Sequence, residues 1–511
     1  MRRSALFAVL TLPGLLACGS GVSTEEAVAS ISDADYLSKI SVIADDSMRG
    51  RANLSPELIE TADWVASQFQ AYGLKPGGDD GTFIQHYTIE RAKLDFEASS
   101  IEVTGGPALA FGKDMNFGRG ATSGAVTGGV VLVVGIPDST EQFPAEQLRG
   151  KHVIFIPAAA GAAPEAGRQR VRIPPGLAEA APASVITVDR NSDDDWAAAV
   201  NRTREQIQSR PPWGSGTGMA SYTIREGSLT SLLAAKGIQA VALKPGARMV
   251  VREVPGLELA ITTATQDLGS FAQPNTVGIL EGSDPQLKNE YLVFSGHMDH
   301  SGVGRPNAQG DSIFNGADDD GSGTIAVVEL AEAFSMLKDR PARSIIFLVV
   351  SGEESGLWGS RYFAEQPVVP LDQIVANLNA DMISRNATDS IVVIGKEHSD
   401  LGTTMNRVNQ EHPELNLTAS DDIWPEENFY RRSDHFNFAR RGVPILFFFC
   451  GTTEDYHQPS DEVSKMDISK ATRTTKLLFH LGMAVGNNPE RPQWNPESRA
   501  QIVDNGETSG R

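Results

Sequence analysis

A stretch rich in possible metal ligands runs from residue 297 to residue 323, with the sequence HMDHSGVGRPNAQGDSIFNGADDDGSG. It contains two histidines and five aspartates. The apolar residues 291–294 before it predict a buried strand, and residues 324–334 after it predict a helix with one apolar face. Imidazole and carboxylate side chains at the end of a buried strand are typical of a metal site in an α/β protein.

The elements that must position these side chains alternate between strands and helices from residue 275 onward. We predict strands at residues 291–296, 344–351, 374–379, 391–394 and 444–449. We predict helices at residues 324–338, 356–365, 400–412 and 468–483. This alternation predicts an α/β fold with a mainly parallel or mixed sheet and helices on both faces.

Further ligand-type residues follow the other predicted strands. These are Glu353 and Glu354, Asp381, and Tyr456 with His457. In open α/β sheets, ligands bind beyond the carboxyl ends of the strands. We therefore expect these side chains to meet His297 and Asp299 at one edge of the sheet.

The remaining chain divides by composition. Residues 32–110 carry two predicted helices, which start near Ser32 and Ser55, and form the N-terminal part of the same domain as residues 273–488. Residues 111–272 are rich in glycine, alanine and proline with short apolar runs, which predicts a separate β-rich inserted domain. Residues 489–511 are polar, which predicts a disordered tail.

The composition and the N-terminus bear on location and partners. The chain of 511 residues has a formal net charge of −21, which argues against a nucleic-acid partner. Residues 1–18 are typical of a secretory signal, and Leu15-Leu16-Ala17-Cys18 is similar to a bacterial lipobox with Cys18 as the lipidated residue. An ordinary signal peptide cut nearby is the alternative. We expect residues 19–31 to be a tether and Cys450 to be a buried structural thiol.

Six short motifs occur in a fixed order: GHMDHSG, NGADDDGSG, SGEESGLWGS, NADMIS, RSDHFNF and DYHQPSD. Together they resemble the two-zinc aminopeptidases of metallopeptidase family 28, which also includes glutamate carboxypeptidase and the transferrin receptor. The resemblance covers residues 275–483 and the N-terminal helices. The insert shows weaker similarity to the protease-associated domain, through residues 148–153 and 236–238.

The resemblance implies two zinc ions per chain and five ligands. Asp319 is expected to bridge both ions. His297 and Asp381 complete the first zinc site, and Glu354 and His457 complete the second. Two metal ions can activate a water and polarise a peptide carbonyl, which is the chemistry of peptide hydrolysis.

The resemblance also implies roles for residues that do not bind zinc. Asp299 is expected to orient His297, Glu353 to act as the general base and Tyr456 to donate to the oxyanion. Asp434 and His435 are expected to support the site. The same pattern implies that Asp318 and Asp320 are neighbours rather than ligands, and that a cis peptide bond follows Asp319. It gives no role to His300, His398 and His412, which we expect to lie at the surface.

These observations favour an exported zinc aminopeptidase that acts on peptides, with its only membrane attachment through a lipid anchor in a bacterial cell envelope. A carboxypeptidase, a dipeptidase or a glutaminyl cyclase on the same fold remains open, and a cyclase is expected to use one zinc. A non-catalytic, receptor-like ectodomain is a further alternative, which the full ligand set disfavours. The sequence leaves open the oligomeric state, the preferred side chain, and whether acidic residues bind a substrate amine or arginines such as Arg431 and Arg432 bind a carboxylate.

Overall fold

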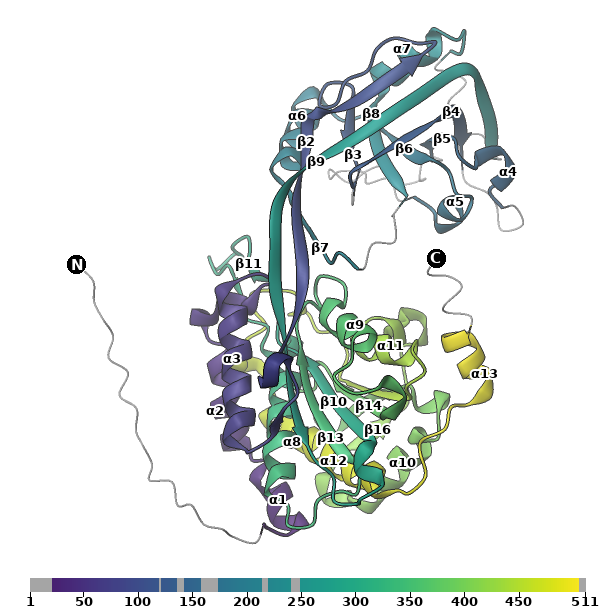
Figure 1. Ribbon diagram of the computed structural model, residues 1–511. Coiled ribbons are helices and arrows are strands. Elements are labelled where there is room, and N and C mark those ends of the chain that lie inside the picture. The colour runs from purple at the N-terminus through teal and green to yellow at the C-terminus, as the bar shows by residue number, and fades with distance from the viewer. Residues whose placement is uncertain are drawn as a thin grey trace, which may run out of the picture. The chain divides into compact units, whose positions relative to one another are not determined.

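The computed structural model describes residues 21–118, 121–135, 142–157, 173–213, 219–239 and 249–504 (Figure 1). The predicted signal segment and Cys18 lie outside these residues. The chain forms two units, residues 1–87 with 273–511, and residues 88–272. Among the described residues, no helix has the length and apolar character needed to cross a membrane.

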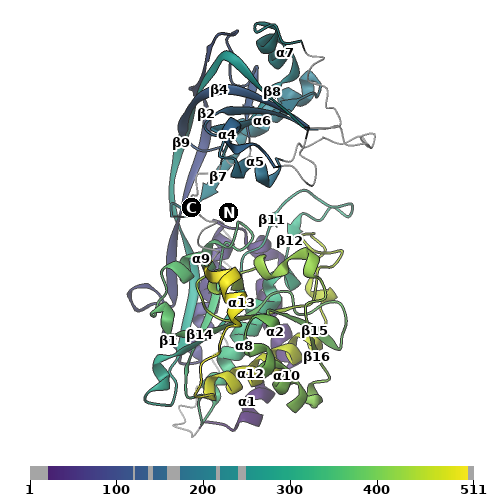
Figure 2. The same ribbon diagram turned by 90° about the vertical axis from the view of Figure 1, so that its right-hand side faces the viewer.

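The first unit is built on a mixed sheet. Its strands are β10 (Tyr291–His297), β13 (Ser344–Val350), β14 (Ile374–Ala380), β15 (Ser390–Ile394), β16 (Thr418–Ser420), β17 (Ile445–Phe449) and the end of β9 (Val250–Leu280). Their order is β16-β15-β17-β14-β10-β13-β9, with β15 and β16 at one edge (Figure 2). The four central strands β17, β14, β10 and β13 run parallel, whereas β9 and β15 pair antiparallel with their neighbours. The parallel centre brings the carboxyl ends of these four strands together.

Helices cover both faces of this sheet. Successive residues of a strand point to opposite sides, so neighbouring residues of β10 contact different faces. Phe294 points to the face that carries α8 (Gly323–Met336), where its ring centroid lies 5.7 Å from that of Phe334. Ser295 points to the other face and donates to Asn379, whose amide donates to Ser433 just before α11 (His435–Ala439). The other helices are α9 (Trp358–Glu365), α10 (Leu401–Glu411) and α12 (Ile468–Asn487). The predicted α/β class is confirmed.

The N-terminal helices pack on the first unit and extend further toward the N-terminus than predicted. They are α1 (Thr24–Ser30), α2 (Asp33–Ile43) and α3 (Pro56–Ala71). Ser32 and Ser55 cap the last two, as predicted. The prediction of a tether over residues 19–31 is wrong from residue 21 onward. Ser23 and Glu26 form a capping box, and Ala27 and Ile31 are fully buried, which stabilises α1.

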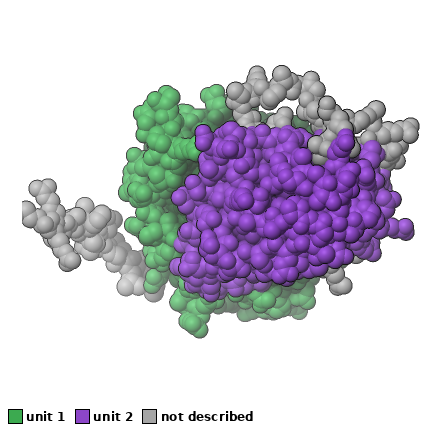
Figure 3. Space-filling view, turned by 90° about the horizontal axis from the view of Figure 1, so that it is seen from above, with its two compact units in different colours: residues 1–87, 273–511 green, residues 88–272 purple. Residues whose placement is uncertain are grey.

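The second unit is β-rich and begins earlier than predicted, at residue 88 rather than at residue 111. Figure 3 colours it purple. The boundary falls inside a single strand, β2 (Ile84–Thr104), which contains no break in sequence pattern that could mark it. The other elements of this unit are β3 (Met115–Phe117), β4 (Gly124–Val134), β5 (His152–Ile156), β6 (Ser184–Asp189), β7 (Ile207–Arg210), β8 (Ala220–Arg225), α4 (Ala145–Leu148), α5 (Pro175–Glu179), α6 (Asp193–Glu205) and α7 (Glu226–Ala234).

The C-terminal segment is ordered up to residue 504, so the predicted disorder from residue 489 is wrong for residues 489–504. This segment contains α13 (Pro496–Arg499) and a short helical turn (Ala500–Asp504). The indole nitrogen of Trp494 donates to the carbonyl of Gly442 at 2.9 Å, and Ile502 is buried. These contacts with distant parts of the chain compensate for the low apolar content of the segment.

Candidate metal centre

A first cluster of ligand atoms forms where β10 and β14 end. His297 is the last residue of β10, and Asp381 directly follows β14. The Nε2 atom of His297 lies 3.7 Å from Oδ2 of Asp381 and 3.4 Å from Oδ1 of Asp319. All three side chains are buried. The Nδ1 atom of His297 donates to the backbone carbonyl of Asp299 at 3.1 Å, which leaves Nε2 free to bind a metal ion.

A second cluster lies on the other side of Asp319. The Nε2 atom of His457 is 3.2 Å from Oδ2 of Asp319 and 3.1 Å from Oε2 of Glu354. The Nδ1 atom of His300 is 2.7 Å from Oε1 of Glu354 and 3.8 Å from Oδ2 of Asp319. The two oxygens of one carboxylate therefore face two separate sets of ligand atoms.

The segment that holds Asp319 is fixed by its neighbours. The peptide bond between Asp319 and Asp320 is cis. Asp320 accepts from the backbone N–H groups of His297 and Gly323, and Asp318 accepts from the backbone and hydroxyl of Ser384. Both carboxylates are thus occupied by the local backbone and lie outside the two clusters, as the motif implied.

The donor set fits zinc, which binds imidazole nitrogen and carboxylate oxygen. Both ring nitrogens of His300 and Oε1 of Glu354 are buried and have no hydrogen-bond partner among the described residues. The Nδ1 atom of His300 nevertheless lies only 2.7 Å from Oε1 of Glu354. Burial lowers the pKa of His457, but its contacts with the carboxylates of Asp319 and Glu354 raise that pKa to about 10. A cation at this position would replace the ring proton, as metal binding to histidine requires.

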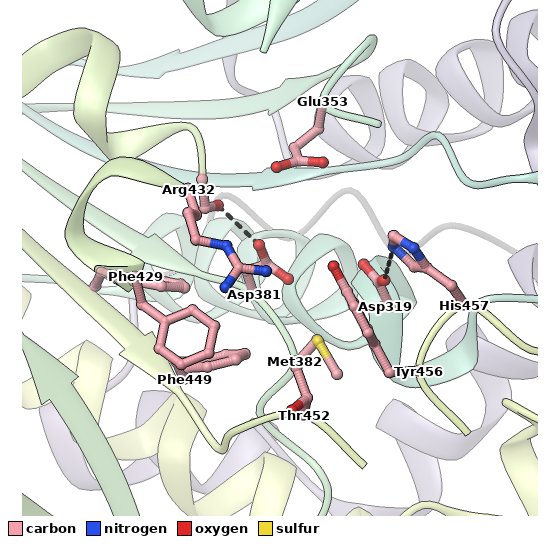
Figure 4. Close-up of a pocket in the computed structure, with 12 residues that line it drawn as sticks. Asp319, Glu353, Asp381, Met382, Phe429, Arg432, Phe449, Thr452, Tyr456 and His457 are labelled. Atoms are coloured by element: carbon pink, nitrogen blue, oxygen red, sulfur yellow. Dashed lines mark hydrogen bonds and ion pairs between the residues drawn. The ribbon is translucent and has the colours of Figure 1, made fainter. Parts of the chain in front are cut away.

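Glu353 and Tyr456 line a pocket beside the clusters. Figure 4 shows Glu353 across from Asp381 and Asp319, with Tyr456 and His457 on the same loop. Burial, and to a lesser extent the neighbouring carboxylates, raise the pKa of Glu353 well above its usual value. The same two causes raise the pKa of Tyr456, so its hydroxyl stays protonated and can donate.

Aromatic and apolar side chains make up much of the rest of this pocket. Phe429, Phe447, Phe449 and Met382 line it, and Arg432 stands at the same pocket (Figure 4). The Arg432 guanidinium lies over the ring of Phe429, 4.7 Å from its centroid. The pocket can therefore hold an apolar side chain close to a positive charge.

Asp299 is buried close to the clusters, but it orients His297 through its backbone carbonyl rather than through the expected carboxylate. The nearest carboxylate oxygen is 3.8 Å from Nδ1 of His297, whereas the backbone carbonyl makes the hydrogen bond to that ring. The carboxylate instead accepts from the backbone N–H groups of Glu353 and Glu354 and from the amide of Asn53. Asp299 thus positions both glutamates.

The segment Ser433-Asp434-His435 has one direct contact with a predicted ligand. The hydroxyl of Ser433 donates to Oδ2 of Asp381 at 2.7 Å. Asp434 and His435 are fully buried nearby, and the His435 ring bonds to the carbonyl of Tyr430 and stacks on Phe447. Burial lowers the pKa of His435 to about 3, so the ring is neutral. Cys450 is a buried free thiol, as predicted.

Three residues near the site were not identified from the sequence. His300 is 2% exposed, so its predicted surface position is wrong; the second histidine of HMDHSG was the available signal. Asp461, the last residue of DYHQPSD, accepts from the backbone N–H groups of Asp318 and Asp319. Arg51 is fully buried and donates to the carbonyls of Met298, Asn315, Gly316 and Ile43, which no local pattern indicates. His398 and His412 are partly buried rather than fully exposed.

Two His–carboxylate clusters that share one aspartate thus lie at the carboxyl ends of the strands of a mixed α/β sheet, where such sheets bind ligands. The model of Peptidase family M28 matches residues 275–482. Residues 275–482 therefore match this peptidase family, as the motifs in them implied.

Curated relatives are similar to part of this chain, and a solved structure shares its fold. A probable zinc metalloprotease of Pyrenophora teres f. teres is 27% identical over 203 residues, which are 34% of this chain and 41% of that protein. A probable zinc metalloprotease of Pyricularia oryzae is 33% identical over 150 residues, 29% of this chain and 28% of that protein. The chain thus spans less than half the length of these relatives. An aminopeptidase from Aneurinibacillus sp. strain AM-1 shares the fold, with a TM-score of 0.52 at 15% identity over 92% of this chain and 97% of that chain.

Proposed function

We propose that this chain is an exported zinc aminopeptidase that removes N-terminal residues from peptides with two zinc ions per chain. The observation that carries the proposal is the position of Asp319. Its Oδ1 atom faces His297, and its Oδ2 atom faces His457, at 3.4 and 3.2 Å. A carboxylate with one oxygen toward each of two ligand sets is suited to bridge two ions. His297 and Asp381 would hold the first ion, and Glu354 and His457 the second, with His300 next to the second.

Zinc, when bound, supplies a Lewis acid that makes water a stronger nucleophile and polarises a carbonyl oxygen. Glu353 takes a proton from the attacking water and passes it to the leaving amine, a role that its position in the pocket supports. The protonated hydroxyl of Tyr456 donates to the oxygen on which negative charge develops. Asp299 holds the backbone of Glu353 so that its carboxylate stays at the pocket.

The lining of the pocket supports an apolar or aromatic residue at the cleaved end of the peptide. The rings of Phe429, Phe447 and Phe449 line the pocket, so burial of an apolar substrate side chain against them is favourable. The free α-amino group of the substrate would lie among the carboxylates of the centre, whose charge favours an ammonium group.

A carboxypeptidase or dipeptidase is the second candidate, and Arg432 favours it. Its guanidinium lines the same pocket and could pair with a substrate carboxylate. A substrate panel separates the two functions: leucyl-amide, an N-acetylated peptide with a free carboxylate, and a free dipeptide, each with and without a chelator. The proposal expects chelator-sensitive hydrolysis of leucyl-amide. Cleavage of the N-acetylated peptide alone would show a carboxypeptidase.

Export and a lipid anchor belong to the same proposal and rest on residues 1–18 of the sequence. The segment Leu15-Leu16-Ala17-Cys18 supports lipidation of Cys18 in a bacterial envelope. Labelling with a radioactive fatty acid in a bacterial host tests it. The wild-type chain is expected to take up label and the Cys18→Ser variant to take up none. Equal labelling of both would exclude this anchor.

The role of the second unit is also a proposal. The weak similarity of residues 148–153 and 236–238 supports a protease-associated-like module that carries no part of the metal clusters. Among the described residues, every member of both clusters belongs to the first unit.

A further inference from the structure

A third group of ligand-type side chains lies away from the candidate metal centre, where α10 ends against α12. His412 directly follows α10, Glu414 lies in the short turn Pro413–Leu415, and His480 belongs to α12. One ligand atom from each of the three lies within 4.8 Å of the others. Figures 1 and 2 show α10 and α12 side by side.

The two imidazole rings face each other closely. Their centroids are 3.5 Å apart and their planes are inclined by 17°. Two protonated rings at this separation would repel each other. The Nδ1 atom of His412 donates to Oε1 of Glu414 at 2.8 Å, so a carboxylate stands beside the pair.

The backbone around the three residues is held in place by other contacts. Arg473 lies on α12, and its guanidinium donates to the carbonyls of Leu415 and Asn416. The helix that carries His480 is thus tied to the turn that carries Glu414. Because the backbone is already held, binding of an ion requires only that the two stacked rings rotate until their in-plane nitrogens point to it.

We propose that His412, Glu414 and His480 form a third cation site, which binds a transition-metal ion such as Zn²⁺ and links the end of α10 to α12. Two imidazoles and one carboxylate are ligands that zinc accepts, and water can complete the coordination. Both rings would have to be neutral to bind the ion, and the carboxylate of Glu414 would balance part of its charge.

Burial and neighbouring groups set the charges of His480 and Glu414. Burial, with a smaller contribution from His412, lowers the pKa of His480 to about 4, so this ring is neutral at pH 7. The hydrogen bond from His412 lowers the pKa of Glu414, which is therefore ionised. Lys476, on the same helix, adds positive charge near His480 and opposes a cation, whereas Glu414 favours one.

The zinc content of the full chain tests the proposal. Wild type and the His412→Ala/His480→Ala double variant are dialysed against the same low-micromolar buffered Zn²⁺, and bound zinc per chain is measured by mass spectrometry. We expect the double variant to bind one zinc fewer than wild type. His86→Ala is the matched control, because His86 also contacts a carboxylate, Asp79 at 3.1 Å, but has no second histidine beside it. We expect this control to bind as much zinc as wild type.

Equal zinc content in wild type and the double variant would overturn the proposal, and so would an equal loss in His86→Ala. Because the readout is a difference between chains, it does not depend on how many ions the centre at Asp319 holds. A thermal melt provides a second readout. Added Zn²⁺ is expected to raise the Tm of wild type more than that of the double variant, since an ion that binds only the folded chain stabilises it. Identical shifts would contradict the structural link between α10 and α12.

Discussion

The carboxylate of Asp299 accepts a hydrogen bond from the backbone N–H of Glu353 at 3.2 Å, although 54 residues separate them. A second oxygen of the same carboxylate accepts from the N–H of Glu354 at 3.3 Å. One buried side chain therefore sets the position of the proposed general base and of a proposed zinc ligand. A residue that contacts no substrate can in this way control both catalysis and metal binding.

Replacing Asp299 by alanine is expected to lower kcat by about 10- to 100-fold, the usual effect of losing a residue that orients metal ligands. The two N–H groups lose their acceptor, so Glu353 and Glu354 can leave the positions that the site needs. The change is measured by steady-state kinetics on leucyl-amide. Asn53→Ala is the control, because it removes one donor to Asp299 and leaves both backbone hydrogen bonds in place. Equal and small effects of the two substitutions would contradict the positioning role.

Glu353→Ala is expected to lower kcat by about 10²- to 10⁴-fold, the range that general acid–base catalysis contributes. Folding and zinc content should be retained, because Glu353 belongs to neither ligand cluster. The measurements are turnover, the far-ultraviolet circular dichroism spectrum and bound zinc. Unchanged turnover would remove Glu353 from the mechanism.

The strand ends, the ligand types and the fold class could be predicted from the sequence because each depends on local patterns. A buried strand followed by HMD or by GEE locates a candidate ligand from the local sequence alone, so distant contacts need not be known. The position of His300 could not be predicted in this way. Whether the second histidine of HMDHSG faces solvent or Glu354 depends on how a loop 54 residues later packs against it.

Other differences have the same origin. The segment after residue 489 is polar, and its order depends on Trp494 reaching Gly442, 52 residues away. The start of the second unit falls inside β2, where composition does not change. Predictions that depended on contacts between distant residues were thus the ones that the structure changed.

His300→Ala is expected to weaken binding of one of the two zinc ions at the centre by about 10- to 100-fold and to spare the other. The reason is that His300 lies beside Glu354 and Asp319 in the second cluster, whereas His297 and Asp381 form the first. Competition with a fluorescent chelator measures both affinities. Equal weakening of both ions, or of neither, would contradict the placement of His300 in the second cluster.

Arg51→Met is expected to lower the free energy of unfolding of the first unit by at least about 3 kcal/mol. The substitution removes the guanidinium donor from four backbone carbonyls, of which that of Gly316 keeps the N–H of Gly321 as a second donor. Each buried acceptor left unpaired costs about 1–3 kcal/mol. Denaturant unfolding measures the loss. Arg49→Met is the matched control, since Arg49 is mostly exposed and forms only a 3.5 Å ion pair with Glu57. That pair contributes at most about 1 kcal/mol. Similar losses in the two variants would show that the buried hydrogen bonds of Arg51 do not stabilise the first unit.

A two-zinc centre bridged by Asp319 can be tested by the return of activity as zinc is added back. The His412→Ala/His480→Ala chain is used, so that the proposed third site takes up no zinc. The metal is first removed with a chelator, and hydrolysis of leucyl-amide is then followed as zinc is added in known ratios to the chain. We expect no hydrolysis without metal and full activity at two zinc ions per chain. Full activity at one zinc ion per chain, or hydrolysis that persists in the metal-free chain, would contradict it.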